Sequence, residues 1–191
     1  MMLKNILTLM LMVIGIYCIG AQGHQITVEL DNYQEEELYL GYYYGDKQYL
    51  RDTVRRNDKG LFIFESDTSQ LQAGIYLVVM APDNKYFQLM VNEDEQHFSV
   101  RTDADQTTEK MQVTGSKDNQ LFYDYLAYLA KQRPVAESLN KGIAAATDNN
   151  AKKGIQQKLE QLNVQVRAHQ EELVKQNPKT LTAALVRANI A

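Results

Sequence analysis

The side chains that most often carry chemistry are few and widely spaced in this 191-residue chain. It has three histidines, His24, His97 and His169, and a single cysteine, Cys18. No His-x-x-x-His or Glu-x-x-His pair occurs, so the histidines do not have the spacing of metal ligands. One cysteine cannot form a Cys-x-x-Cys redox pair. We expect a packed ring at His169, which takes a leucine position in a helical pattern, and a mobile His24.

The carboxylates gather in three groups, at residues 35–37, at residues 93–95, and at Asp103, Asp105 and Glu109. Paired carboxylates can perform acid–base catalysis or bind calcium. These groups fall in expected turns, however, and they do not have the glycine-centred spacing of a calcium loop. We interpret them as solvated loop charges.

Asp52 differs from the other carboxylates because it lies within an expected strand. Alternation places it on one face with Leu50 and Val54, pointing inward. A buried carboxylate needs a hydrogen-bond partner or a cation. We therefore interpret Asp52 as a structural anchor.

Tyrosine is the unusual residue of the composition, with twelve copies and no tryptophan. A hairpin that turns at residues 45–47 would pair Tyr44 with Gln48 and Tyr43 with Tyr49. One outer face would then carry Tyr39, Tyr43, Tyr49, Arg51 and Thr53. Tyrosine beside arginine is typical of interfaces, with a protein partner or a sugar, and the lack of tryptophan weakens the sugar. Tyrosines that merely cover a sheet edge are an equally good interpretation.

Several classes of function are not supported by the sequence. No nucleophile elbow, phosphate-binding loop or dinucleotide motif occurs. The net charge of −4 is spread along the chain, which argues against nucleic acid as a partner. We expect no catalytic residue, no cofactor and no metal, and the chain is not expected to be an enzyme. A hydrolase with carboxylates from separate loops is the weakest alternative.

The hydrophobic pattern predicts an α+β protein whose strands precede its helices. Between residues 25 and 114, alternating apolar residues mark about eight short strands, which predict an antiparallel β-sandwich or a small barrel. Residues 75–80 are apolar on both faces and predict a central strand.

From Ser116 the spacing lengthens to that of helices. Ser116 is the expected N-cap, Asp118 suits the first turn, and Pro134 should kink or restart the helix. A loop at residues 147–150 and a heptad-like seam predict an antiparallel helical hairpin. A third helix should begin at Pro178.

The first residues are typical of a secretory signal peptide. Lys4 precedes an apolar run over residues 6–20, which is too short to span a membrane, and small residues follow it. Cleavage is expected after Ala21, with Gly23 as the second choice. Lipid anchoring at Cys18 is less favoured. We therefore expect an exported protein, periplasmic or associated with the outer membrane, with a signal peptide at 1–21, a β-rich domain at 22–115 and a helical segment at 116–191.

Four short segments resemble a known family. They are residues 38–53 (LYLGYYYGDKQYLRDT), 74–76 (GIY), 84–87 (NKYF), and Gly115-Ser116 followed by Asn119. Together they resemble the N-terminal accessory module of exported TlpA/ResA-type thioredoxin-like thiol:disulfide oxidoreductases of Gram-negative bacteria. In that family the Cys-x-x-Cys pair belongs to a C-terminal domain, so no catalytic residue carries over.

The resemblance implies a non-catalytic docking module whose partner is a thioredoxin-like domain or its client. It also implies that the helical segment leads toward an absent thioredoxin-like domain, in a truncated chain. The alternative is a free-standing binding module for a glycan or a small apolar ligand.

Overall fold

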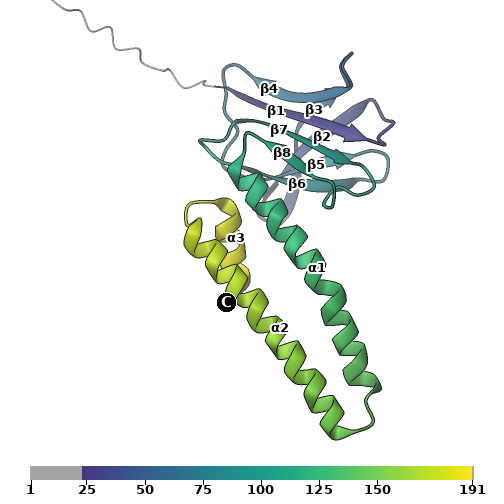
Figure 1. Cartoon of the computed structure of the whole chain (residues 1–191). Helices are drawn as coiled ribbons and strands as arrows, with labels where there is room; N and C mark the ends of the chain where they lie inside the picture. Colours follow the sequence, from purple (N-terminus) through teal and green to yellow (C-terminus); the bar gives the residue numbers. More distant parts are fainter. Residues whose placement is uncertain (1–22, 191) are drawn as a thin grey trace, which may run out of the picture.

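The computed structural model describes residues 23–190, which form eight strands followed by three helices (Figure 1). This order confirms the predicted α+β class. The expected signal peptide, including Cys18, lies outside the described residues. The strands are β1 (His24–Asp31), β2 (Glu37–Tyr44), β3 (Lys47–Arg55), β4 (Leu61–Ser66), β5 (Gly74–Met80), β6 (Lys85–Val91), β7 (His97–Asp103) and β8 (Gln112–Thr114).

The strands form two four-stranded sheets, with the orders β4-β1-β7-β8 and β3-β2-β5-β6, so the fold is a sandwich and not a closed barrel. Alternate residues of the strands point inward, and those in the core include Ile26, Val28, Leu38, Phe62 and Phe64. Burial of this apolar surface is the main favourable contribution to folding. The predicted central strand, β5, lies between β2 and β6.

One strand pair departs from the predicted antiparallel arrangement. β1 and β7 run parallel, with Ile26 beside Phe98 and Val28 beside Val100. Parallel neighbours need a long crossover connection, and here most of the sandwich separates the two strands in sequence. Alternation along a strand carries no information about the direction of a distant neighbour, so the sequence could not predict this pair.

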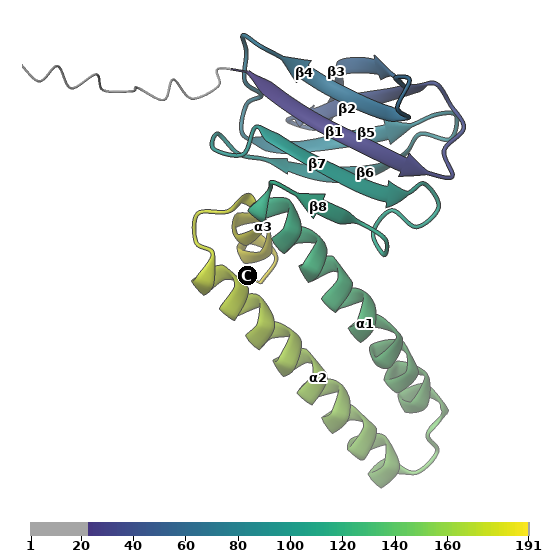
Figure 2. The ribbon, with the colours of Figure 1, turned by 45° about the horizontal axis from the view of Figure 1, so that its top comes forward.

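The helices form an antiparallel hairpin, as predicted, and a short third helix, and the hairpin projects from the sandwich (Figures 1 and 2). They are α1 (Lys117–Ala145), α2 (Asn149–Gln176) and α3 (Leu181–Ile190). Ser116 caps α1 as predicted, since its hydroxyl accepts a hydrogen bond from the Asn119 amide. α1 continues through Pro134, so the helix does not restart there. One detail was wrong: α3 begins three residues after Pro178, which lies in a turn.

The first turns of α1 cover the outer edge of β6. The Asn119 side chain accepts from the Met90 amide at 2.8 Å and donates to the Met90 carbonyl at 2.7 Å. One turn later, the Tyr123 hydroxyl donates to the Gln88 carbonyl at 2.7 Å, and burial raises the pKa of this tyrosine. Side chains of α1 therefore satisfy backbone groups at a sheet edge that a further strand would otherwise pair with.

Two carboxylates hold helix N-termini at the junction with the sandwich. Glu95 accepts from the Ser116 hydroxyl at 2.6 Å and from the amides of Lys117 and Asp118, so it caps α1 and is not the solvated charge that we predicted. Asp118 is fully buried and accepts from the amides of Leu181 and Thr182 at 2.7 and 3.0 Å. It thereby caps α3.

Candidate interaction surface

The tyrosine-rich hairpin joins β2 to β3 through a two-residue turn. Its residues are Gly45 and Asp46, and Gly45 has a positive φ of 62°, which suits the first central position of a type II′ turn. Tyr44 consequently pairs with Lys47, and Tyr42 pairs with Tyr49. The predicted pairs were wrong by one residue because we placed three residues in the turn.

This shift moves Tyr49 to the other face of the hairpin. The Tyr49 ring stacks on Tyr42, with centroids 5.8 Å apart, whereas Tyr43 points to the opposite face by alternation. A bulge, where the register shifts between Leu40 and Gly41, also interrupts the alternation of side chains between the two faces of β3. Tyr39, Tyr43, Tyr49 and Arg51 therefore do not share a single face.

The end of this hairpin is nonetheless the most exposed aromatic region of the sandwich. The exposed fractions are 44% for Tyr43, 76% for Tyr44, 43% for Tyr49 and 64% for Leu50. We call these four residues the hairpin tip. Sequence reasoning missed Tyr44 and Leu50, although their closeness to Gly45 was a usable signal, because a tight turn at a sheet corner leaves its flanking residues in solvent.

Behind the hairpin tip lies a cavity of about 280 Å³ lined by Tyr42, Arg51, Gln70, Gln72 and Tyr76. The Tyr76 hydroxyl donates to the Gln72 carbonyl at 3.1 Å. Burial raises the pKa of Tyr76, and the nearby Arg51 guanidinium opposes this effect. The cavity thus combines aromatic rings, amides and one cation.

Tyr39 lies at the other end of the hairpin and is bound to its neighbours. Its hydroxyl donates to Glu37 at 3.1 Å, and Arg55 donates to the same carboxylate at 2.9 Å. These hydrogen bonds lower the pKa of Glu37. Tyr39 therefore belongs to a surface network and is separate from the hairpin tip.

Asp52 is half-buried and lies opposite the buried Leu40, so it is on the inner face of the sheet with Val54, as predicted. Its carboxylate accepts a hydrogen bond from the Thr53 amide at 2.7 Å. Because the bulge lies between Leu50 and Asp52 in register, Leu50 is exposed and does not join Asp52 on an inner face. The expected partner for this carboxylate exists, and it is a backbone amide at the strand edge.

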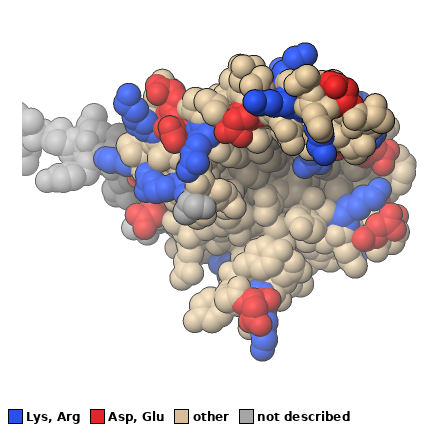
Figure 3. Space-filling view, turned by 90° about the horizontal axis from the view of Figure 1, so that it is seen from below, with Lys and Arg blue, Asp and Glu red and all other residues tan. Residues whose placement is uncertain are grey.

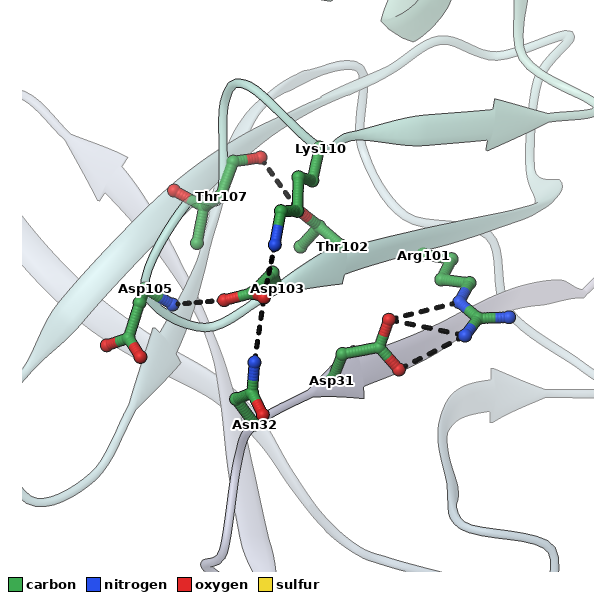
Figure 4. A network of polar contacts seen from close by, with 8 residues as sticks. All are labelled: Asp31, Asn32, Arg101, Thr102, Asp103, Asp105, Thr107 and Lys110. Atoms are coloured by element: carbon green, nitrogen blue, oxygen red, sulfur yellow. Dashed lines mark hydrogen bonds and ion pairs between the residues drawn. The ribbon is translucent and has the colours of Figure 1, made fainter.

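Asp103 is the second carboxylate that we wrongly interpreted as solvated. Its side chain is only 4% exposed and accepts from Lys110 at 2.9 Å, Asn32 at 2.8 Å and the Asp105 amide at 2.9 Å (Figure 4). These bonds join the ends of β1 and β7 to the following loop. They lower the pKa of Asp103. Asp105 and Glu109 are exposed, as predicted.

This network predicts a loss of stability in acid. Because the pKa of Asp103 is lower in the folded state, its contribution is complete above the ordinary aspartate pKa of 3.8 and is lost as the pH falls below it. Asp103→Asn should therefore be less stable than the wild type at pH 7, and this difference should be smaller at pH 2.5, in urea unfolding followed by circular dichroism. Asp105→Asn is the matched control. An equal difference in stability between Asp103→Asn and the wild type at both pH values would contradict the stabilising role of the Asp103 carboxylate.

The histidines do not form a site. His24 was expected to be mobile but begins β1, where it is buried and its Nδ1 lies 2.7 Å from the Ser69 carbonyl oxygen. His169 is exposed, yet its ring stacks on Tyr128 with centroids 3.8 Å apart. His97 begins β7. Within residues 23–190, no group of three or more His, Cys, Asp or Glu side chains could hold a metal ion.

Charge and hydropathy add two general observations. In the face that Figure 3 shows, lysine and arginine are interspersed with aspartate and glutamate and form no single-sign patch. No helix in the described part of the chain is both long and apolar enough to cross a membrane.

Comparison with known protein families finds one family that matches the sandwich. Residues 24–122 match the family described as a domain of unknown function, DUF4369. The match extends from β1 to the first turns of α1 and therefore includes both the hairpin tip and the Asn119 contact with β6. No curated protein matches the chain. Because the matched residues make up more than half of its length, the chain belongs to the DUF4369 family.

Proposed function

We propose that this protein is a non-catalytic docking module of the cell envelope, which binds a thioredoxin-like domain or the client of that domain. The hairpin tip is the observation that carries the proposal. It exposes three tyrosines and a leucine on the strands beside a two-residue turn, where their burial in the free protein contributes little. Exposed aromatic side chains with polar ends are typical of protein interfaces.

The placement of the resembling segments supports the thioredoxin-like context. Residues 38–53 build the β2–β3 hairpin, residues 74–76 begin β5 beside it, and Ser116 and Asn119 form the junction between β6 and α1. These segments carry structure and exposed contact surface, and none adds a nucleophile or an acid–base pair. This distribution fits a module that positions another domain.

A photo-crosslinking experiment tests the proposal. Benzoylphenylalanine would replace Tyr44 in the exported protein in its native cells, and mass spectrometry would identify any adduct. A partner with a Cys-x-x-Cys thioredoxin-like domain, or a substrate of such a domain, is the expected result. The same photoreactive residue at Tyr86, which is 49% exposed and lies outside the hairpin tip, provides the control for random collisions.

The double substitution Tyr43→Ser and Tyr49→Ser should reduce the Tyr44 adduct about tenfold, because aromatic anchors dominate interface energies. Its melting temperature should fall only slightly, since both side chains are nearly half exposed. Quantified adduct and thermal unfolding of the same preparation separate the two effects. An unchanged adduct would exclude the hairpin tip as the docking surface.

The Tyr42–Arg51 cavity favours a second candidate, a binding module for an anionic glycan. Tyrosine rings can stack on a sugar, and the guanidinium of Arg51 can pair with a carboxylate. Titration with galacturonate oligomers, followed by amide chemical shifts at Gln70 and Gln72, tests it. If neither acidic nor neutral oligomers change the amide chemical shifts at Gln70 and Gln72, this candidate is excluded.

A further inference from the structure

The two edges of the β3-β2-β5-β6 sheet are treated differently by the fold. Asn119 and Tyr123 occupy the outer backbone groups of β6. At the other edge, no strand or helix in the described part of the chain pairs with β3 on its outer side. Long edge strands without cover are sites at which another chain can add a strand.

The hydrogen-bond pattern of β3 shows which of its backbone groups point away from β2. The Arg56 amide donates to the Glu36 carbonyl, so residue 56 is turned toward β2. Hydrogen-bonding direction alternates along an antiparallel pair, so Thr53 and Arg55 turn their N–H and C=O groups away from β2. Such groups can be paired only by an extended backbone alongside them.

Asp52 already makes a hydrogen bond to one of these outward-pointing backbone groups. Its carboxylate accepts from the Thr53 amide at 2.7 Å, which satisfies the amide in the free protein. An incoming strand must displace this contact before it can accept from the same amide. Asp52 thereby protects the edge against indiscriminate pairing, as charged side chains on edge strands commonly do.

The charge of β3 indicates the kind of strand that fits. It carries Lys47, Arg51 and Arg55 but only one carboxylate, in a protein whose net charge is −4. Arg55 is paired with Glu37, whereas neither Lys47 nor Arg51 has an ion-pair partner among residues 23–190. The edge strands of the other sheet, β4 (LFIFES) and β8 (QVT), carry no cation.

We propose that β3 binds an extended, carboxylate-bearing segment of another protein by strand addition, with Asp52 as the gate. This inference rests on the proposed docking function and specifies its binding mode. A second copy of the chain is the less suitable occupant. Antiparallel pairing of two β3 strands would bring their lysines and arginines together, and like charges on neighbouring strands are destabilising.

Fluorescence anisotropy with the peptide (Glu-Val)4 tests the proposal on the full chain. The wild type should bind this probe, with affinity that falls as salt rises, and should not bind (Lys-Val)4. A (Glu-Val)4 peptide with alternate backbone N-methyl groups should also fail. In ¹⁵N spectra, the shifted amides should be those of Thr53 and Arg55.

Three variants separate backbone pairing, gating and charge. Thr53→Pro removes an outward N–H and should weaken binding about tenfold, whereas Thr53→Ala keeps that N–H and should bind like the wild type. Asp52→Ala frees the amide and removes a repelling charge, so binding should tighten several-fold. Asp52→Asn keeps an acceptor for the amide and should give a smaller gain.

Other results would overturn the proposal in distinct ways. Equal binding by Thr53→Pro, shifts at Gln70 and Gln72, or no binding of (Glu-Val)4 would each exclude strand addition at β3. A concentration-dependent dimer in sedimentation that (Glu-Val)4 does not dissociate would assign the edge to a second copy. If the Tyr44 crosslink persists in these cases, docking by the hairpin tip stands and only its binding mode is wrong. If Tyr44 gives no crosslink but (Glu-Val)4 still binds, strand addition at β3 stands and docking by the hairpin tip is wrong.

Discussion

Replacing Asn119 by leucine is expected to lower the free energy of unfolding by about 3–5 kcal/mol. The Asn119 side chain is fully buried and makes hydrogen bonds to the amide and the carbonyl of Met90 and to the Ser116 hydroxyl. Leucine has a similar volume but leaves both backbone groups of β6 without partners. Each buried, unpaired polar group costs about 1–3 kcal/mol.

Urea unfolding followed by circular dichroism measures this loss, and amide hydrogen exchange at Met90 locates it. Gln120→Leu is the control, because the neighbouring Gln120 is exposed and should change stability by no more than about 0.5 kcal/mol. A loss of less than about 1 kcal/mol for Asn119→Leu, with Met90 still protected, would mean that water replaces the amide.

The strands could be predicted from the sequence because their alternation is local. Ile26, Val28 and Leu38 face the core where period-2 spacing places them, and all eight expected strands are present. The parallel pairing of β1 with β7 and the bulge at Leu40 and Gly41 depend on contacts between distant segments. One residue in the length of the hairpin turn was enough to move Tyr49 to the other face.

The candidate site was less predictable because turn residues take their roles from remote partners. Asp103 and Glu95 were both interpreted as solvated charges, yet one meets Lys110 and Asn32 and the other caps a helix that begins 22 residues later. The amino-acid sequence does not distinguish a carboxylate that will be solvated from one that will be bound. Only the fold decides which of them has a donor within reach.

Replacing Asp118 by asparagine is expected to lower the free energy of unfolding by about 2–4 kcal/mol and to release the N-terminus of α3 from α1. Both carboxylate oxygens are used, one by the Leu181 amide and one by the Thr182 amide, and Asn92 also donates to this side chain. Asparagine has one acceptor oxygen, and its NH₂ group would oppose a donor. It also removes the negative charge that favours a helix N-terminus.

Hydrogen exchange distinguishes this release from general unfolding. In Asp118→Asn, the amides of α3 should lose protection while those of β1 and β5 keep theirs, because the sandwich core does not contain α3. Asp124→Asn, an exposed change on the same helix, should alter neither set. If α3 stays protected in Asp118→Asn, then the apolar contacts of Ala183 and Val186 hold it without the cap. In that case Asp118 would contribute stability to the junction as a whole, and α3 would be held by the helical hairpin, where Ala183 and Val186 pack with Tyr125 and Leu173.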